Sequence, residues 1–309
     1  MRRLVLATVV LFPCTALADV RPSGDARFGL RYDSGAAVTT RIEKRFTLNF
    51  DGTTRTDGGV TLGGRVRIRS EANAASGLSG ARVFARFGGL TVGAGNFDGA
   101  IEKMPGILAD GIGLTGLGKH GVIFNVAETA ERDRHADWDT FSSTGNGAEG
   151  IELIGAVGDA SFHVSYSSNG LRGLAGPRYR LAAHGAYNFG AVTLAIGGQS
   201  SDLDSEQKLG ATLAGRFSGT DVAIGYAVNG GGTARRIDKV ALTVGRGFGP
   251  WRLDGYVAHQ GFSDAVVTTP TTWGLGGAYA LGGGASIRGG VEGTTVGTVR
   301  ADIGVTFNF

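Results

Sequence analysis

The chain has 309 residues, of which 56 are glycine, six are proline and one is cysteine. Glycine at about 18% of the chain, against roughly 7% in an average protein, disfavours long helices, and the glycines keep no collagen-like period of three. Hydrophobic residues make up 42% of the chain and charged residues 18%, which excludes a disordered protein. The single cysteine excludes a disulfide framework and a cysteine-based zinc site. The net charge of +3 gives no indication of nucleic-acid binding, so a large β-rich structure is the class that remains.

The first 18 residues have the pattern of an export signal. Arg2 and Arg3 precede a short apolar run, and the small residues Ala16 and Ala18 mark a cleavage site. The run is about half of the ~20 residues that a membrane-spanning helix needs, and no later stretch is long enough either. We therefore expect residues 1–18 to be a cleaved signal peptide and residues 19–309 to form a single domain.

The residues after the signal alternate between apolar and polar side chains. Phe28, Leu30 and Tyr32 fall on one face of an extended strand, and Arg27 and Arg31 fall on the other. Such alternation also suits a soluble sandwich, but the segments run to about nine to twelve residues, longer than the five to six typical of soluble strands. This length matches a tilted membrane crossing, and very short turns alternate with longer polar connections, which is the layout of an outer-membrane barrel.

We expect an all-β fold, an up-and-down transmembrane β-barrel of sixteen antiparallel strands. An even number of strands places both ends of the chain on the periplasmic side. Residues 121–127 also alternate, but a seventeenth strand would break this parity, so we assign them to a long third loop over residues 98–148. The expected strands are 24–33, 40–51, 60–71, 80–88, 89–97, 149–157, 161–168, 178–189, 191–199, 206–217, 220–229, 237–247, 251–261, 272–281, 283–292 and 299–309.

Aromatic residues gather at the strand ends that carry the short turns. Amphipathic rings concentrate at bilayer interfaces, so we expect a periplasmic girdle here. The alternative is that these rings fill the core of a soluble sandwich. The residues are Phe50, Phe87, Phe189, Phe217, Phe248, Trp251, Tyr279, Phe307 and Phe309.

Three short motifs and the last residue resemble those of a known family. The motifs are SGDARFG at 23–29, GNFDGA at 95–100 and LGGGASI at 281–287, and the chain ends in Phe309. With them the sequence resembles general Gram-negative outer-membrane porins of the alphaproteobacterial Rhodobacter type. The resemblance implies a homotrimer in the bacterial outer membrane, in contact with membrane lipid and lipopolysaccharide, that passes ions and small hydrophilic solutes by passive diffusion. A terminal phenylalanine is similar to the signal that the barrel-assembly machinery recognises.

Eleven arginines fall on the face opposite the apolar one. An arginine on the lipid face costs about 2 to 4 kcal/mol at the bilayer midplane, so the nine on the first four strands would together exceed the ~5 to 15 kcal/mol stability of an ordinary domain. They must face water, which at this depth means the lumen. Because Asp25, Asp33 and Glu43 are too few to neutralise them, we expect a net basic wall. The eleven are Arg27, Arg31, Arg41, Arg45, Arg65, Arg67, Arg69, Arg82, Arg86, Arg288 and Arg300.

The long third loop is rich in acidic residues. The resemblance implies that it folds into the barrel and narrows it, so that Asp98, Glu102 and Asp110 near its start would face the arginine wall. Opposed charges across a narrow water-filled gap filter polar over apolar solutes. The other interpretation is a surface loop whose acids are solvated or bind Ca²⁺ weakly. Small inward residues on the later strands, such as Gly210 and Gly225, would leave the lumen open.

No catalytic motif in the sequence is specific. Matches to G-x-G-x-x-G at 111–116 and 145–150 are expected by chance among so many glycines, and no G-x-S-x-G elbow is present. His163 and His184 fall on inward phases and are interpreted as solvated lumen residues. We expect no enzyme activity, no cofactor and no nucleic-acid partner. Two alternatives to a channel remain, a structural or adhesive barrel with little conductance and a barrel hydrolase, for which the outward His259 lacks an obvious serine partner.

Overall fold

The computed structural model describes residues 19–72, 74–107, 112–129, 132–134, 137–168, 179–261 and 269–309. The expected signal peptide and Asp110 lie outside these residues, so both stay predictions. Within the described ranges, no helix is both long and apolar enough to cross a membrane.

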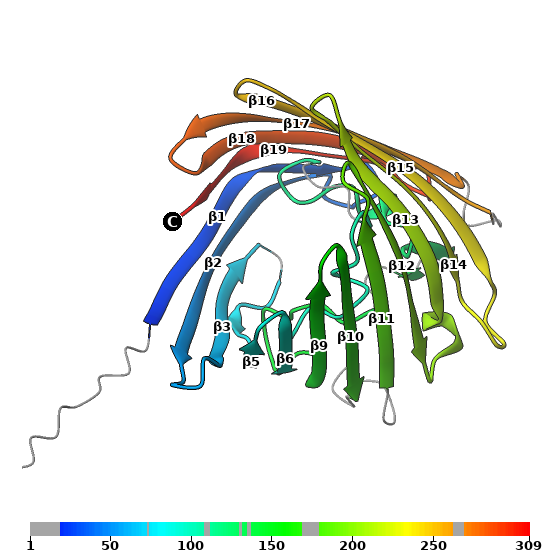
Figure 1. Cartoon of the computed structure of the whole chain (residues 1–309). Helices are drawn as coiled ribbons and strands as arrows, with labels where there is room; N and C mark the ends of the chain where they lie inside the picture. The colour runs from blue at the N-terminus through cyan, green and yellow to red at the C-terminus, as the bar shows by residue number, and fades with distance from the viewer. Residues whose placement is uncertain are drawn as a thin grey trace, which may run out of the picture.

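The chain forms a closed antiparallel barrel in which each strand pairs with the next (Figure 1). The first strand pairs with both the second and the last, which closes the ring. The sixteen barrel strands are β1 (Asp19–Asp33), β2 (Thr40–Arg55), β3 (Thr61–Glu71), β5 (Arg82–Phe87), β6 (Leu90–Gly95), β9 (Gly150–Val157), β10 (Ala160–Ser168), β11 (Tyr179–Asn188), β12 (Val192–Ser201), β13 (Lys208–Phe217), β14 (Thr220–Asn229), β15 (Ile237–Phe248), β16 (Trp251–Gln260), β17 (Thr271–Gly282), β18 (Ala285–Gly293) and β19 (Val299–Asn308).

The sixteen-stranded architecture predicted from the sequence is confirmed. Strand β1 begins earlier than expected because its first residues pair with β2 alone, beyond the end of β19. The short β4 (Gly77–Leu78) pairs with the end of β3, and the 3-10 helix η2 (Asp204–Glu206) lies between β12 and β13. The segment 121–127 is not a barrel strand, as expected. It follows the 3-10 helix η1 (Lys119–Gly121) and leads into β7 (Val126–Thr129), which pairs only with β8 (Arg132–Arg134).

The barrel is apolar on its outer face. Ile42 is 72% exposed, Phe28 56% and Leu30 51%, whereas Glu43 and Thr47, on the opposite phase, are buried. This is the reverse of a soluble sandwich and suits a wall whose outer side faces lipid. The aromatic ends of the strands follow the same pattern, with exposed rings at Phe50, Phe87, Phe189, Phe217, Phe248, Trp251 and Phe309.

Glycine has a definite role at the tight turns and at the barrel seam. The turn between β13 and β14 places Ser218 at φ 48° and Gly219 at φ 79°, both in the left-handed region that a type I′ hairpin requires. At the seam, the backbone N–H of Gly24 donates to the carbonyl oxygen of Phe309 at 2.8 Å, and the carbonyl oxygen of Gly24 accepts from the N–H of Phe309 at 3.1 Å. A Cβ on Gly24 would lie 2.5 Å from the Phe309 ring, so this contact needs glycine.

The third loop lies inside the barrel (Figure 1). The hydrophobic core lies between this loop and the wall. Loop residues Met104, Ile123 and Phe124 are buried against alanines on β11 to β16. A Cβ on Gly210 would lie 2.9 Å from the Phe124 ring, and one on Gly225 would lie 3.0 Å from Ile123. The expectation that small inward residues leave the lumen open is therefore wrong for this wall, because the loop needs their small size in order to pack there.

Candidate functional site

The third loop crosses the lumen and is held at its tip by the last strand. Asp302 on β19 accepts hydrogen bonds from the backbone N–H groups of Leu114 and Thr115, both at 2.7 Å, and from the Thr115 hydroxyl at 2.5 Å. Arg27 on β1 donates to the Leu114 carbonyl at 3.3 Å and is paired with Glu43 at 2.7 Å. The loop therefore reaches from β6 to the barrel seam, where β1 and β19 pair.

Polar side chains of the far wall bind the backbone of the loop. A loop inside a barrel must find partners for its own N–H and C=O groups, since water is excluded where it packs. Strands β13 to β17 each supply at least one such side chain. Lys208 donates to the Phe124 carbonyl, Asn229 to that of Ile123, Lys239 to that of Asn125 and Thr272 to that of His120, while Gln260 both donates to and accepts from the backbone of Ala127.

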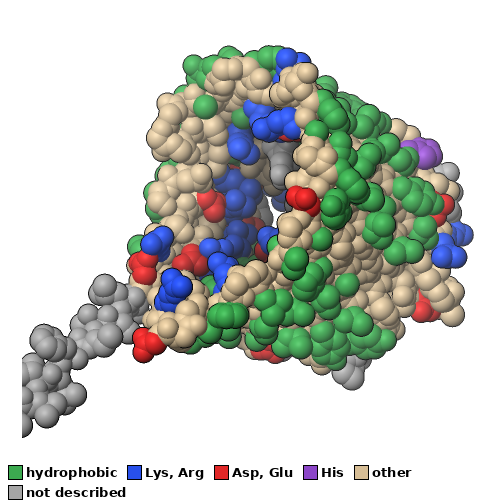
Figure 2. Space-filling view, viewed as in Figure 1, with side chains coloured by type: hydrophobic (Ala, Val, Ile, Leu, Met, Phe, Trp, Pro, Cys, Tyr) green, Lys and Arg blue, Asp and Glu red, His purple; other side chains and the backbone are tan. Residues whose placement is uncertain are grey.

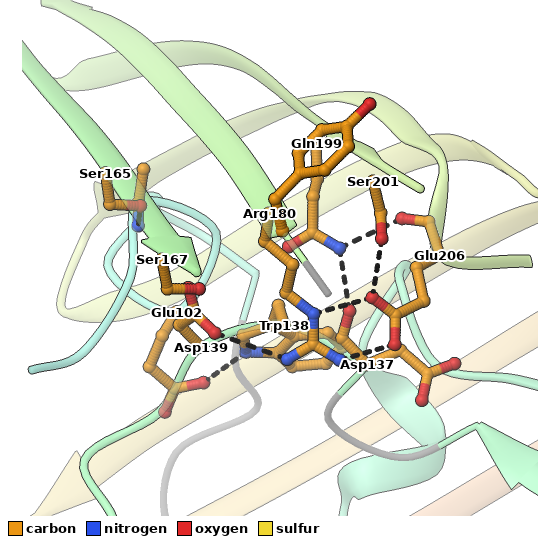
Figure 3. Close-up of polar contacts among 12 residues, drawn as sticks. Glu102, Asp137, Trp138, Asp139, Ser165, Ser167, Arg180, Gln199, Ser201 and Glu206 are labelled. Carbon is orange, nitrogen blue, oxygen red and sulfur yellow. Dashed lines mark hydrogen bonds and ion pairs between the residues drawn. The ribbon is translucent and has the colours of Figure 1, made fainter. Parts of the chain in front are cut away.

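The returning limb of the loop is fixed by an ionic cluster on β10 to β12 (Figure 3). Arg180 is paired with Glu206 at 2.5 Å and with Asp139 of the loop at 3.3 Å. Ser167 donates to Asp139 at 2.6 Å, and Gln199 donates to the Asp137 carbonyl at 2.7 Å. The cluster places the loop segment 137–139 firmly against the wall.

A cavity remains between the start of the loop and the wall formed by β2, β3, β5 and β9. Figure 2 shows lysine and arginine side chains gathered inside the hollow of the barrel. We call this cavity the constriction. Its lining comprises Asp51, Arg65, Arg82, Phe84, Arg86, Asp98, Lys103, Phe141, Glu152 and Ile154.

Six of the eleven predicted arginines are paired with carboxylates. More of the wall is paired than the sequence analysis allowed for, because that count of acids left out Asp51, Glu71 and Glu152. Strand pairing brings Asp51 opposite Arg65, and the side chains meet at 2.7 Å. The other pairs are Arg27–Glu43 at 2.7 Å, Arg45–Asp25 at 2.9 Å, Arg69–Glu71 at 3.8 Å, Arg82–Glu152 at 2.5 Å and Arg300–Asp33 at 3.1 Å.

The remaining five arginines have different surroundings. Arg31 and Arg41 are cross-strand neighbours near the barrel end opposite the termini. Arg86 donates to the Thr91 hydroxyl at 3.2 Å, and Arg288 donates to the Ser286 hydroxyl at 3.4 Å. Arg67 donates to the hydroxyl of Ser143 in the loop, so it anchors the loop as well as forming part of the wall.

Of all eleven predicted arginines, three line the constriction: Arg65, Arg82 and Arg86.

Of the three predicted loop acids, the structure brings Asp98 to the arginine wall. Its carboxylate lies 2.7 Å from the Lys103 ammonium and accepts from the Phe141 N–H at 2.8 Å. Glu102 instead accepts from the indole N–H of Trp138 at 2.7 Å. Burial raises the pKa of Glu102, and that hydrogen bond opposes the rise. Asp110 lies outside the described residues.

Glu152 is not among the predicted site residues, and two histidines are not solvated as predicted. Glu152 is buried on β9 and is brought to Arg82 only because β6 and β9 pair across the long loop, a pairing that no local pattern shows. His163 and His184 do face inward, but they are buried rather than solvated. Among the described residues no group of three or more His, Cys, Asp or Glu could hold a metal ion, and the weak calcium site stays a prediction.

Comparison with known proteins identifies the family. The model of the Gram-negative porin family matches residues 5–297. This chain belongs to that family. The porin of Fuscovulum blasticum is 26% identical over 305 residues, and that of Rhodobacter capsulatus is 28% identical over 324 residues; each alignment covers 94% of this chain and 100% of the relative. A solved mutant of the Rh. blastica porin has the same fold, with a TM-score of 0.77 at 24% identity, covering 94% of this chain and 100% of the other.

Family membership decides between the classes that the sequence left open. This porin is a non-enzymatic channel of the Gram-negative outer membrane. The hydrolase alternative is therefore wrong. The outward His259 is exposed, and its ring Nδ1 lies 2.9 Å from the hydroxyl of Thr271 on the neighbouring strand.

Proposed function

We propose that this porin passes ions and small hydrophilic solutes by passive diffusion through the constriction, with a mild preference for anions. One observation carries the proposal. The constriction lining contains four cationic side chains, Arg65, Arg82, Arg86 and Lys103, against three carboxylates, Asp51, Asp98 and Glu152. The constriction therefore has a small excess of positive charge, less than the number of arginines on the wall suggests.

The arrangement of these charges supports a polar filter. Asp98 stands on the loop, while the three arginines stand on the barrel wall. Charges of opposite sign across a narrow aqueous gap orient water and favour polar solutes, and a ring of fixed charge selects ions by sign. The effect depends on ionic strength, because the Debye length falls from about 10 Å at 0.1 M to about 3 Å at 1 M salt.

Reversal potentials of the purified protein in a planar bilayer, measured across a salt gradient at pH 8, test the proposal. We expect stepwise openings and a mild anion preference, which Arg65→Glu shifts toward cations. The matched control is Arg236→Glu, which reverses the charge of an exposed arginine between β14 and β15. A cation-selective wild-type pore, or an Arg65→Glu pore with unchanged selectivity, would contradict the filter, and a protein that gives no openings would contradict diffusion through the constriction.

We also infer a homotrimer surrounded by membrane lipid and lipopolysaccharide, as family membership supports. The exposed apolar outer face suits lipid contact, and the exposed Phe309 at the barrel seam suits recognition by the barrel-assembly machinery. The mass of the detergent-solubilised particle, measured by light scattering, checks the trimer. Intact-mass spectrometry of protein from the outer membrane checks cleavage after Ala18 and a mature chain of residues 19–309.

A further inference from the structure

The outer face of the barrel has an apolar groove that crosses the four neighbouring strands β15 to β18 (Figure 1). The groove has a volume of about 710 Å³. Among the side chains that line it, Val244, Leu253 and Leu275 are exposed and therefore point away from the lumen. The groove shares no lining residue with the constriction. It is a separate hollow in the surface that faces lipid.

Glycines at outward positions form the floor of this groove. Gly277 on β17 lies opposite Leu253 on one neighbouring strand and opposite Gly289 on the other. A Cβ on Gly277 would lie 3.4 Å from the Leu253 side chain, which is an ordinary contact. Glycine inside a strand often marks a position that a ligand approaches closely. The strand has room for a side chain at position 277, so the space above this glycine is available to a ligand.

An arginine lies at one end of the groove. Arg246 has the same strand phase as the exposed Leu242 and Val244, so its side chain leaves the barrel on the outer side. The guanidinium lies 5.2 Å from the centre of the Phe248 ring and donates to the Thr220 hydroxyl at 3.3 Å. No ion pair between described residues includes Arg246. It therefore adds a positive charge without a carboxylate partner to an otherwise apolar groove.

The arginine end of the groove lies close to the membrane interface. Arg246 is two residues, or about 7 Å, from the end of β15 at Phe248. Beside that turn the rings of Trp251 and Tyr279 meet with centroids 4.6 Å apart. Such aromatic rings sit at headgroup level, where an outward arginine is tolerated far better than at the bilayer midplane. The short turns are on the periplasmic side, so this interface belongs to the inner leaflet.

We propose that the groove binds one phospholipid of the inner leaflet, with its phosphate on Arg246 and one acyl chain over Gly277 and Gly289. A guanidinium matches a phosphate with two parallel hydrogen bonds. Three strand spacings of about 4.8 Å separate β15 from β18, so the groove accepts a chain segment of about 14 Å. The outer face of a second copy is apolar and would offer Arg246 no anion. Charge at one end and apolar surface along the rest therefore favour a lipid.

Native mass spectrometry of the detergent-solubilised protein, titrated with dipalmitoyl phosphatidylglycerol, tests the phosphate contact. We expect one lipid per chain to bind more tightly than any further lipid. Arg246→Gln should weaken this binding by about tenfold, the effect of losing one hydrogen bond to a charged group. Arg246→Lys keeps the charge and should lose less. Arg236→Gln, at an exposed arginine between β14 and β15, is the matched control and should bind as wild type does.

Gly277→Val tests the apolar part of the site. The new side chain fills the floor, and each methylene kept out of the groove reduces the affinity about fourfold. The control is Gly185→Val, at an outward glycine on β11 where a Cβ meets nothing within 4 Å. Dipalmitoylglycerol, which has no phosphate, should bind more weakly than the phospholipid and equally to wild type and Arg246→Gln. Glycerol phosphate, which has no acyl chains, should not be retained.

Electron cryo-microscopy of the protein in nanodiscs of phosphatidylglycerol and phosphatidylethanolamine gives a direct second measurement. We expect headgroup density at Arg246 and chain density over Gly277 in wild type. A groove without lipid density, or equal lipid retention by wild type, Arg246→Gln and Gly277→Val, overturns the proposal. If Gly277→Val does not fold, equal retention by wild type and Arg246→Gln overturns it. A smaller particle mass for Gly277→Val in light scattering would show an interface between copies of this chain and would also overturn it.

The inference rests on the lipid contact proposed above for the outer face and goes beyond the channel function. Its outcome is separate from that of the charged filter. An anion-selective pore that retains no lipid at the groove would overturn the lipid site alone. A cation-selective pore that retains one lipid dependent on Arg246 would overturn the anion preference and support the lipid site.

Discussion

Arg82 on β5 and Glu152 on β9 form an ion pair of 2.5 Å across the strand that separates them. The intervening strand β6 presents Gly93 between the two side chains, opposite Phe84 on one side and Glu152 on the other. A Cβ on Gly93 would lie 2.5 Å from the Glu152 carboxylate oxygen. The absence of a side chain at this one position therefore allows two wall charges to neutralise each other.

Gly93→Ala should displace the Glu152 carboxylate and leave Arg82 without its partner. The carboxylate is the flexible end of a side chain, so the barrel still folds, and the freed guanidinium increases anion selectivity by up to about fivefold. The reversal potential in a salt gradient measures the change. Gly185→Ala is the control, because a Cβ there meets nothing within 4 Å, and equal behaviour of the two variants would contradict the role of Gly93.

Arg67 and Phe141 couple the barrel wall to the loop. The guanidinium of Arg67 lies 4.5 Å from the centre of the Phe141 ring, donates to Asn49 at 2.9 Å and donates to the loop residue Ser143 at 3.2 Å. A cation–π contact contributes about 0.5 to 2 kcal/mol. A double-mutant cycle with Arg67→Ala and Phe141→Ala should therefore give a coupling energy of about 1 kcal/mol in the free energy of unfolding.

The current noise of the open channel tests whether Arg67 contacts the loop in a way that Arg65 does not. Arg67→Ala should also increase the current noise of the open channel, since the loop loses an anchor, whereas Arg65→Ala should change selectivity with little added noise. Arg65 is paired with Asp51 of its own wall and not with the loop. Additive effects of Arg67→Ala and Phe141→Ala, or equal noise in Arg65→Ala and Arg67→Ala, would show that Arg67 does not hold the loop.

Glu102 should make the loop less stable as pH rises. Burial raises the pKa of Glu102; the Trp138 hydrogen bond lowers it, and the charge of Asp98 adds to the rise. Because the pKa of Glu102 is raised in the folded state, the folded protein binds this proton more tightly than the unfolded chain does. The stability that this proton contributes is fully present below the ordinary pKa of 4.5 and is lost as pH rises through the raised pKa of the folded protein. Glu102→Gln should therefore melt at a higher temperature than wild type at pH 8 and at the same temperature at pH 4.

Thermal unfolding in micelles, followed by circular dichroism from pH 4 to pH 8, measures this difference. Glu149→Gln, a substitution at an exposed carboxylate, controls for the loss of one charge. If Glu102→Gln and wild type melt with the same pH dependence, burial of this carboxyl group does not affect stability.

The barrel could be predicted from the sequence because its signals are local. Side-chain alternation requires only neighbouring residues, as at Phe28 and Arg27, and glycine at positive φ marks turns such as Gly219. Asp25 and Asp51 lie one strand away from the arginines that they neutralise. Register decides these pairs, and a shift of one residue would reverse every face. Strand boundaries alone were therefore insufficient to derive the charge of the wall.

The interior of the site depends on contacts between distant parts of the chain. The inward position of Gly225 on its strand predicted an open lumen, yet Ile123 of the loop packs against this glycine. Glu152 meets Arg82 only after the loop has brought β6 and β9 together. The signal in the sequence for a loop packed inside the barrel was a set of inward polar residues on the far wall, Lys208, Asn229 and Gln260. Their side chains donate hydrogen bonds to the backbone of the third loop.

Asp302 should control how far the loop closes the lumen. It accepts three hydrogen bonds from Leu114 and Thr115, and each bond to a charged group contributes about 1.5 to 3 kcal/mol. Asp302→Ala leaves the two backbone N–H groups without their acceptor, so the loop tip should detach from β19 while the anchors on β10 to β12 hold its base. We expect a larger and noisier unit conductance and a free energy of unfolding reduced by about 4.5 kcal/mol or more. Asp159→Ala, at an exposed turn, should change neither quantity, and an Asp302→Ala channel with wild-type conductance would show that the tip is held by packing alone.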